Sequence, residues 1–224
     1  MASLSRWFLR INLDVPYTRK MEWWNGFIEQ LLATTWYEGV AVASGIASVW
    51  LSWKENILVY PTGIVSVLIY VYITWQYGLY ATAGVNSYYF LMSVYGWYHW
   101  THTSDSSSQI PITANSKMEN FLSFGILLLA YVVLVFVLTS FTNSDVPYWD
   151  SLTTATAVTA MWLMARKKIE HWLFWIVCNL SSIPLYTYKG LPFTSLQFLV
   201  FTILAIAGWV SWREKLLALN RKSS

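Results

Sequence analysis

The sequence predicts an all-α integral membrane protein with seven transmembrane helices in a 3+1+3 parallel repeat. Hydrophobic residues make up 56% of its 224 residues and charged residues only 11%, whereas a soluble domain carries about 25% charged residues. The chain also contains seven apolar runs close to the roughly 20 residues that a membrane-crossing helix needs. Finally, the sequence Gly-Trp-x-x-Trp occurs twice, beginning at Gly96 and at Gly208. We call the spacing from Gly96 to Gly208 the repeat interval.

Composition narrows the functional classes further. The fifteen Trp and fifteen Tyr residues favour membrane interfaces and stacked binding sites. The net charge of +3 is small, and no basic cluster indicates nucleic acid as a partner. The single cysteine, Cys178, lies in an apolar run, and we expect it to be a packing residue. The lipid bilayer is therefore the expected environment.

Residues 1–34 are predicted to form an interfacial, amphipathic N-terminal segment. Aromatic residues are interleaved with arginines in residues 1–20. Residues 21–33 mix apolar and polar side chains, as in a helix that lies along the membrane. An alternative is that residues 21–33 extend the first span. The N-terminus has no uninterrupted apolar core, so we expect no cleavable signal peptide.

Residues 35–101 contain the first three predicted spans. The first covers residues 36–53 and ends at the polar turn 54–56. The second covers residues 57–75, with a proline in its first turns, where proline is tolerated. The third covers residues 79–101 and ends in the first Gly-Trp-x-x-Trp sequence.

Residues 102–147 are predicted to form a loop followed by a connecting helix. Serine, threonine and asparagine dominate residues 102–120, so we expect this loop to be solvated. The span at residues 121–141 is almost entirely aliphatic and carries no side chain suited to bind a ligand. We expect this fourth span to be a lipid-facing connector.

Residues 148–213 repeat the pattern of the first three spans, and residues 214–224 form a tail. Trp36 and Trp149 begin the two copies, and their separation exceeds the repeat interval by a single position. The two copies therefore match in length as well as in the sequence that ends them. The three spans of the second copy cover residues 149–165, 172–188 and 193–212.

The connecting span gives both copies the same orientation in the membrane. This is a parallel repeat, of the kind found in SWEET sugar transporters. The loops on one side carry nine Lys and Arg residues and those on the other side five. The excess predicts a cytoplasmic C-terminus and an N-terminus outside the cell.

Three spans carry amide side chains beside aromatic rings. Residues three or four apart share one face of a helix. Amides supply donors and acceptors for a hydroxyl-bearing ligand, and rings supply a stacking surface. The candidate substrate-binding residues are Asn86, Tyr89 and Trp97 on the third span, Trp172, Trp175, Asn179 and Ser182 on the sixth, and Gln197 on the seventh.

Structural roles compete with binding. Amides in membrane helices also hydrogen-bond across helix interfaces, an alternative that is open for Asn86, Asn179 and Gln197. The glycines of the two Gly-Trp-x-x-Trp sequences are expected to permit close helix contact. An aromatic belt at the membrane surface is an alternative for Trp97, Trp100, Trp209 and Trp212. Solvated positions at the interface are expected for His99, His102 and His171.

Several activities are excluded by what the spans lack. No Asp, Glu, Lys or Arg lies in the middle of a span, whereas proton relays and sodium sites generally need such groups or broken helices. The sequence has no GxxxxGK[ST] loop for ATP, and we find neither a catalytic nucleophile nor a metal cluster. We therefore expect a passive transporter, not an enzyme, with no cofactor.

Four segments carry a resemblance to a known family. They are Trp36-x-Glu38-Gly39, Gln76 with Leu79-Tyr80-Ala81, Tyr95-Gly96-Trp97-Tyr98-x-Trp100, and Arg166-Lys167-x-x-Glu170-x-Trp172-x-x-Trp175-x-x-x-Asn179. Through them the chain resembles the bacterial nicotinamide riboside transporters of the PnuC family over residues 34–215. That resemblance implies a SWEET-like fold, facilitated diffusion of nicotinamide riboside for vitamin B3 uptake and NAD biosynthesis, location in the inner membrane and assembly as a homotrimer. It also implies that a cytoplasmic riboside kinase traps the substrate.

The implied substrate suits the candidate residues. Nicotinamide riboside carries a pyridinium cation, which aromatic faces attract, and Trp175 is expected to stack on it. Its ribose hydroxyls and carboxamide are expected to bond Asn179, Gln76 and Gln197. A related vitamin precursor such as thiamine, or a sugar, is the alternative substrate, because related transporters share this architecture.

Overall fold

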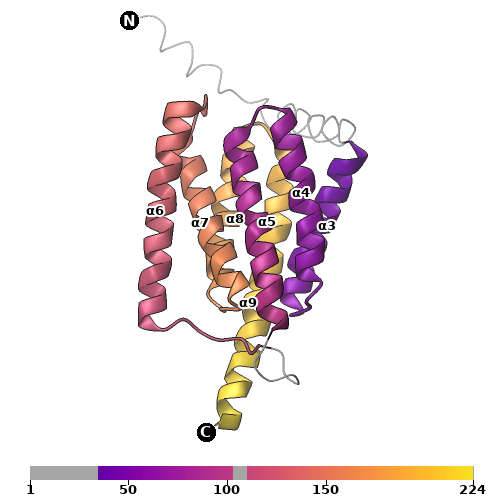
Figure 1. Cartoon of the computed structure of the whole chain (residues 1–224), viewed down its shortest axis with the longest axis vertical. Helices are drawn as coiled ribbons and strands as arrows, with labels where there is room; N and C mark the ends of the chain where they lie inside the picture. Colours follow the sequence, from indigo (N-terminus) through magenta and orange to yellow (C-terminus); the bar gives the residue numbers. More distant parts are fainter. Residues whose placement is uncertain (1–34, 103–109, 224) are drawn as a thin grey trace, which may run out of the picture.

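The computed structural model describes residues 35–102 and 110–223, which form a bundle of seven helices (Figure 1). The predicted N-terminal segment lies outside the described residues. The helices are α3 (Trp36–Trp53), α4 (Val59–Gln76), α5 (Tyr80–Thr101), α6 (Lys117–Phe141), α7 (Pro147–Ala165), α8 (His171–Tyr188) and α9 (Pro192–Ser223).

The expected helices are all present among the described residues, and two of their ends differ from the expected positions by more than two residues. Helix α6 begins at Lys117, ahead of the expected position 121, because Ser116 and Glu119 form a capping box. The Ser116 hydroxyl accepts from the Glu119 amide at 3.2 Å, and the Glu119 carboxylate accepts from the Ser116 amide at 2.8 Å. Helix α9 continues through the expected tail to Ser223.

Within residues 35–102 and 110–223, three helices are long and apolar enough to cross a membrane on length and composition alone. They are α4, α6 and the stretch Thr194–Leu219 of α9. Of the other described helices, α5, α7 and α8 carry more Ser, Thr, Tyr, Trp and Asn than these three. These residues lower hydropathy, and they are also the residues that can bind a polar ligand inside a bundle.

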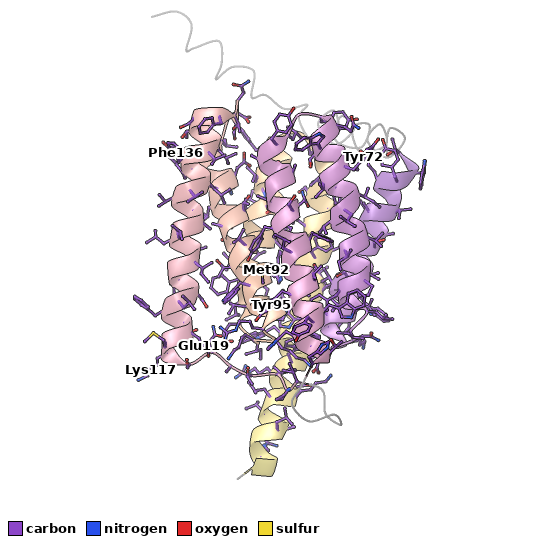
Figure 2. All side chains as sticks on the ribbon, in the orientation of Figure 1. Tyr72, Met92, Tyr95, Lys117, Glu119 and Phe136 are labelled. Atoms are coloured by element: carbon purple, nitrogen blue, oxygen red, sulfur yellow. The ribbon has the colours of Figure 1, made fainter. Side chains whose placement is uncertain are left out.

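The packing of α3–α5 corresponds to the packing of α7–α9. Within each set the helices contact one another in sequence, and the sets close on each other through α5 against α7 and α9 against α3. A two-fold axis that exchanges α3–α5 with α7–α9 turns the first of these two contacts into the second, so the contacts indicate two-fold symmetry between the halves. Helix α6 packs against α7 at the side of this arrangement (Figure 1), and its Phe136 side chain is exposed (Figure 2).

Backbone geometry recurs at the repeat interval. Glu55 and Lys167 both have a left-handed backbone, with φ of 54° and 56°, in the turns after α3 and α7. Gly78 and Gly190 both have φ of 70° after α4 and α8, where glycine adopts the left-handed conformation that ends a helix. The two halves therefore share their turn conformations as well as their helix contacts.

The two glycines of the Gly-Trp-x-x-Trp sequences lie against aromatic rings, as expected for sites of close helix contact. A Cβ atom on Gly96 would lie 2.5 Å from the Tyr60 ring, and one on Gly208 would lie 2.4 Å from the Trp172 ring. Tyr60 and Trp172 are themselves separated by the repeat interval. The expectation of close helix contact at both glycines is thus confirmed, and only glycine fits at either position.

Gly208→Ala is expected to destabilise the protein by about 1–3 kcal/mol, because the new methyl group overlaps a fixed indole. Gly125→Ala on α6 is the matched control, since nothing lies within 4 Å of its Cβ position. Thermal unfolding of both variants in detergent checks the prediction. Equal melting temperatures for the two variants would contradict it.

Two expectations about solvation are wrong. Residues 110–116, expected in a solvated loop, dock on the turn between α7 and α8: the Ile169 amide donates to Thr113 O at 3.0 Å, and Ile112 is buried. His171, expected to be solvated, is fully buried, with its ring centre 4.4 Å from that of Trp172 and 4.8 Å from that of Trp212. In both cases the covering groups come from elements distant in the sequence.

Candidate functional site

A cavity of about 500 Å³ lies inside the bundle. Six helices line it, α3, α4 and α5 from one half and α7, α8 and α9 from the other, whereas no residue of α6 does. Its volume falls in the range of roughly 300–1,000 Å³ typical of small-molecule sites. The cavity is therefore the candidate binding site.

Most residues that line the cavity form pairs separated by the repeat interval. Both members of a pair line it from opposite halves, so the cavity lies between the halves at equivalent depths of each. The pairs include Tyr60 with Trp172, Gly63 with Trp175, Ser66 with Cys178, Val67 with Asn179, Val85 with Gln197 and Tyr89 with Phe201.

The structure brings most of the predicted binding residues together. They reach the cavity from α5, α8 and α9, which confirms that the polar faces of these three helices point to one space. The predicted residues that line the cavity are Asn86, Tyr89, Trp172, Trp175, Asn179, Ser182 and Gln197.

Two predicted binding residues do not line the cavity. Trp97 is 42% exposed, because the buried face of α5 passes through Gly96 and Trp100, and Trp97 lies roughly 100° around the helix from Gly96. Gln76 is the last residue of α4 and is exposed. Neither side chain is therefore placed to contact a ligand in the cavity.

Asn179 is buried without a hydrogen-bond partner. Its side chain is 3% exposed, it lines the cavity, and it forms no hydrogen bond with any residue in 35–102 or 110–223. A buried amide costs free energy unless it is paired. The described residues offer no bond across a helix interface that would explain this amide, so its donors and acceptor are available to a ligand.

The other polar groups of the cavity fall into two sets. Among the described residues the Ser52 and Tyr60 hydroxyls and the Trp172 indole N–H have no hydrogen-bond partner, whereas Asn86 and Ser182 bond within their own helices. The Asn86 side chain donates to Thr82 O at 3.0 Å, and the Ser182 hydroxyl donates to Cys178 O at 2.8 Å. Gln197 lines the cavity from α9 and, like Asn179, has no hydrogen bond to a described residue. Asn179 and Gln197 are thus the two amides most free to bind.

The two walls of the cavity differ chemically. The α7–α9 wall carries Trp175 and Asn179, whereas the corresponding positions on α4 are Gly63 and Val67. At these two positions the second half presents an aromatic ring and an amide and the first half small, apolar groups, whereas Asn86 and Tyr89 line the cavity from α5. The cavity is therefore asymmetric at the level of Trp175 and Asn179.

Sequence reasoning missed the contribution of α3 and α7 and the tyrosines Tyr70 and Tyr186, which also line the cavity. The signal available was the run of small residues on α7, where Ala155, Ala157 and Ala160 are all buried. Small residues allow neighbouring helices to approach closely. Such a run places a helix next to the centre of a bundle even when it carries no polar candidate.

An aromatic floor closes one end of the cavity. We use this name for Tyr60, Trp100, His171, Trp172 and Trp212, all of which are buried. Ring centres lie 5.2 Å apart for Tyr60 and Trp100, 6.1 Å for Trp100 and Trp212, and 5.7 Å for Trp172 and Trp212. Trp100 and Trp212 are therefore core residues, and the aromatic-belt alternative is wrong for them.

The chain is similar to known vitamin transporters. A family model described as nicotinamide mononucleotide transporter matches residues 35–214. The nicotinamide riboside transporter PnuC of Escherichia coli (strain K12) is 25% identical over 203 residues, which cover 80% of this chain and 85% of the relative. The riboflavin/roseoflavin transporter RibM of Streptomyces davaonensis is 21% identical over 183 residues, covering 79% and 84%.

A solved structure shares the fold. The crystal structure of the vitamin B3 transporter PnuC superposes with a TM-score of 0.67 at 22% sequence identity, covering 88% of this chain and 89% of that one. At this sequence identity, the similarity establishes the shared architecture of the bundle alone.

Proposed function

We propose that this chain, which belongs to the nicotinamide mononucleotide transporter family, carries nicotinamide riboside across a bacterial inner membrane. The family consists of transporters, so the chain is a membrane transporter and not an enzyme. The observation that carries the choice of substrate is the cavity in which Trp175 and the unpartnered amide of Asn179 share one wall.

The chemistry of this wall matches the two parts of the proposed substrate. The pyridinium ring is a flat cation, and the face of an indole attracts such a cation by about 0.5–2 kcal/mol. The carboxamide and the ribose hydroxyls need both donors and acceptors, which Asn179 and Gln197 supply. Trp175 would hold the ring, and the two amides would fix the orientation.

We further propose that transport is facilitated diffusion by alternating access between α3–α5 and α7–α9, acting as parallel repeats in a seven-span protein. The described residues lining the cavity include no Asp, Glu, Lys, Arg or His, the side chains on which proton relays are built. Phosphorylation of the riboside by a cytoplasmic kinase would then maintain the inward gradient. The C-terminus would face the cytoplasm, as the excess of basic residues at that end favours.

A flavin is the second candidate substrate, because a relative named as a riboflavin transporter aligns over most of the chain. Riboflavin has a larger, neutral ring system and would need more of the space beside Gly63. The charge and the size of the ligand's ring therefore distinguish the two candidates.

Calorimetry on detergent-purified protein tests the proposal. Nicotinamide riboside is expected to bind tightly, whereas nicotinamide, riboflavin, thiamine and glucose at the same concentrations are expected to bind at least tenfold more weakly, a difference of about 1.4 kcal/mol. Tighter binding of riboflavin, thiamine or glucose would replace the proposed substrate. Tight binding of nicotinamide alone would show that the ribose is not recognised.

A further inference from the structure

A lysine is buried at the end of the bundle where the aromatic floor lies. Lys167, in the turn between α7 and α8, is 2% exposed. Its Nζ atom lies 2.7 Å from Ile110 O, 3.3 Å from a Glu55 carboxylate oxygen and 4.7 Å from the centre of the Trp100 ring. The cation thus reaches from one half of the bundle onto groups of the other half.

Glu55 is the counterpart of Lys167 in the first half. It holds the same left-handed position in the turn after α3, one repeat interval earlier in the chain. Its second carboxylate oxygen accepts from Lys215 Nζ at 2.6 Å, which adds α9 to the same cluster. Corresponding turns of the two halves are therefore joined by an ion pair that lies next to the aromatic floor.

A second contact crosses at the same level. The Trp212 indole on α9 donates a hydrogen bond to Ser52 O near the end of α3, at 3.2 Å. The floor is thus held from both sides, by this bond and by the ion pair. For the cavity to open at this end, the turns after α3 and α7 must separate, and the Glu55–Lys167 pair must then break.

Stability alone gives a poor reason for burying this pair. Burial lowers the pKa of Lys167, since the charged form loses its hydration, and Glu55 offsets part of that effect. Buried ion pairs often contribute little net stability, because desolvation cancels much of the attraction. An ion pair of this kind forms only when the two turns are in one relative position, and both charges become hydrated when the turns separate. Such a pair can therefore form and break as this end of the cavity closes and opens.

We propose that Glu55 and Lys167 form a latch that holds the floor end of the cavity closed. The two are positioning residues for transport: they touch no substrate, and they set the balance between closed and open states of this end. The inference rests on the proposed transport function, because only a transporter must open the cavity to both sides.

Neighbouring charges provide a matched control. Glu119 on α6 pairs with Arg166 at 3.3 Å and with Lys168 at 2.8 Å, in the same turn as Lys167. These pairs link α6 to the α7–α8 turn and do not join the two halves. Glu119→Gln removes both of these ion pairs while keeping a side chain that completes the capping box of α6.

The single cysteine makes opening measurable without substrate. Cys178 lines the cavity and is 4% exposed. A membrane-impermeant maleimide, applied to membrane vesicles on the face that carries the C-terminus, should therefore label the wild type slowly. Removal of a C-terminal tag by added protease identifies that face in each vesicle preparation.

Glu55→Gln and Lys167→Met are each expected to accelerate labelling from this face by about tenfold, and Glu119→Gln is expected to leave the rate unchanged. The double variant Glu55→Gln/Lys167→Met should label no faster than the faster single variant, because both substitutions break the same contact, whereas two independent losses of packing would multiply their effects. Glu55 has a more exposed side chain than Lys167, 16% against 3%, so Glu55→Gln serves as the test variant if Lys167→Met does not fold.

Wild-type labelling rates in the single variants, or a double variant whose rate is the product of the two single effects, would overturn the latch. The assay uses no substrate, so its result does not depend on which substrate is carried. If nicotinamide riboside does not bind but the labelling follows the expected pattern, the latch stands and the substrate assignment fails.

Discussion

Asn179→Leu is expected to reduce the affinity for nicotinamide riboside about 100-fold or more. The amide lines the cavity, is buried and has no partner among the described residues, so the ligand is its expected partner. Its removal leaves a donor and an acceptor of the ligand unpaired, at about 1–3 kcal/mol each, and about 1.4 kcal/mol corresponds to a factor of ten. Calorimetric titration of the purified variant measures the loss.

The melting temperature of the ligand-free variant provides the control. Leucine has a similar size, and replacing an unpaired buried amide by an apolar group is neutral or stabilising, so Asn179→Leu should melt at or above the wild-type temperature. Asn86→Leu is the matched comparison, because Asn86 already donates to Thr82 O in its own helix, and its loss of affinity should stay below about tenfold. A folded Asn179→Leu variant with wild-type affinity would remove Asn179 from the site.

Trp175→Leu is expected to weaken binding by about tenfold or more, because a cation–π contact in a desolvated site contributes about 2 kcal/mol. Trp175→Phe should lose less, since a smaller aromatic face remains. Both variants keep an apolar side chain in a cavity wall that packs against the core, so both should fold. Measured affinities for nicotinamide riboside check the expected order, in which the wild type binds most tightly, Trp175→Phe less tightly and Trp175→Leu least tightly.

The charge of the ligand separates a cation–π contact from simple packing. The reduced riboside has a neutral dihydropyridine ring of nearly the same size. The wild type should prefer the cation, and Trp175→Leu should lose that preference. If the ratio of the two affinities is the same in both proteins, Trp175 contributes shape alone and the proposed stacking is wrong.

The helices were predictable because each is an apolar run bounded by polar turns. Helix α3 has the predicted bounds, Trp36–Trp53. The start of α6 was missed because its capping box, Ser116 with Glu119, lies inside a polar stretch that composition assigns to a loop. Local signals of this kind are present in the sequence, but they are weaker than hydropathy.

The burial of polar residues was not predictable in the same way. His171 is enclosed by Trp212 from another helix, and Lys167 is covered by Trp100 and by the carbonyl group of Ile110. Such burial depends on how helices distant in sequence meet. Spacing of three and four residues does identify a helix face, which is why the amides of the cavity were found. The same spacing is less accurate towards the ends of helices, and Trp97, near the end of α5, does not line the cavity.

The connecting helix α6 has a consequence for how such a site can evolve. Two identical three-helix subunits around a two-fold axis must place the same side chain on both sides of that axis. With α6 joining the halves in one polypeptide, a mutation alters one side only. Trp175 can therefore line the cavity in one half while Gly63 holds the equivalent position in the other, where a homodimer would place an indole in both halves and reduce the space. Covalent fusion is what allows an asymmetric ligand to be bound in a symmetric scaffold.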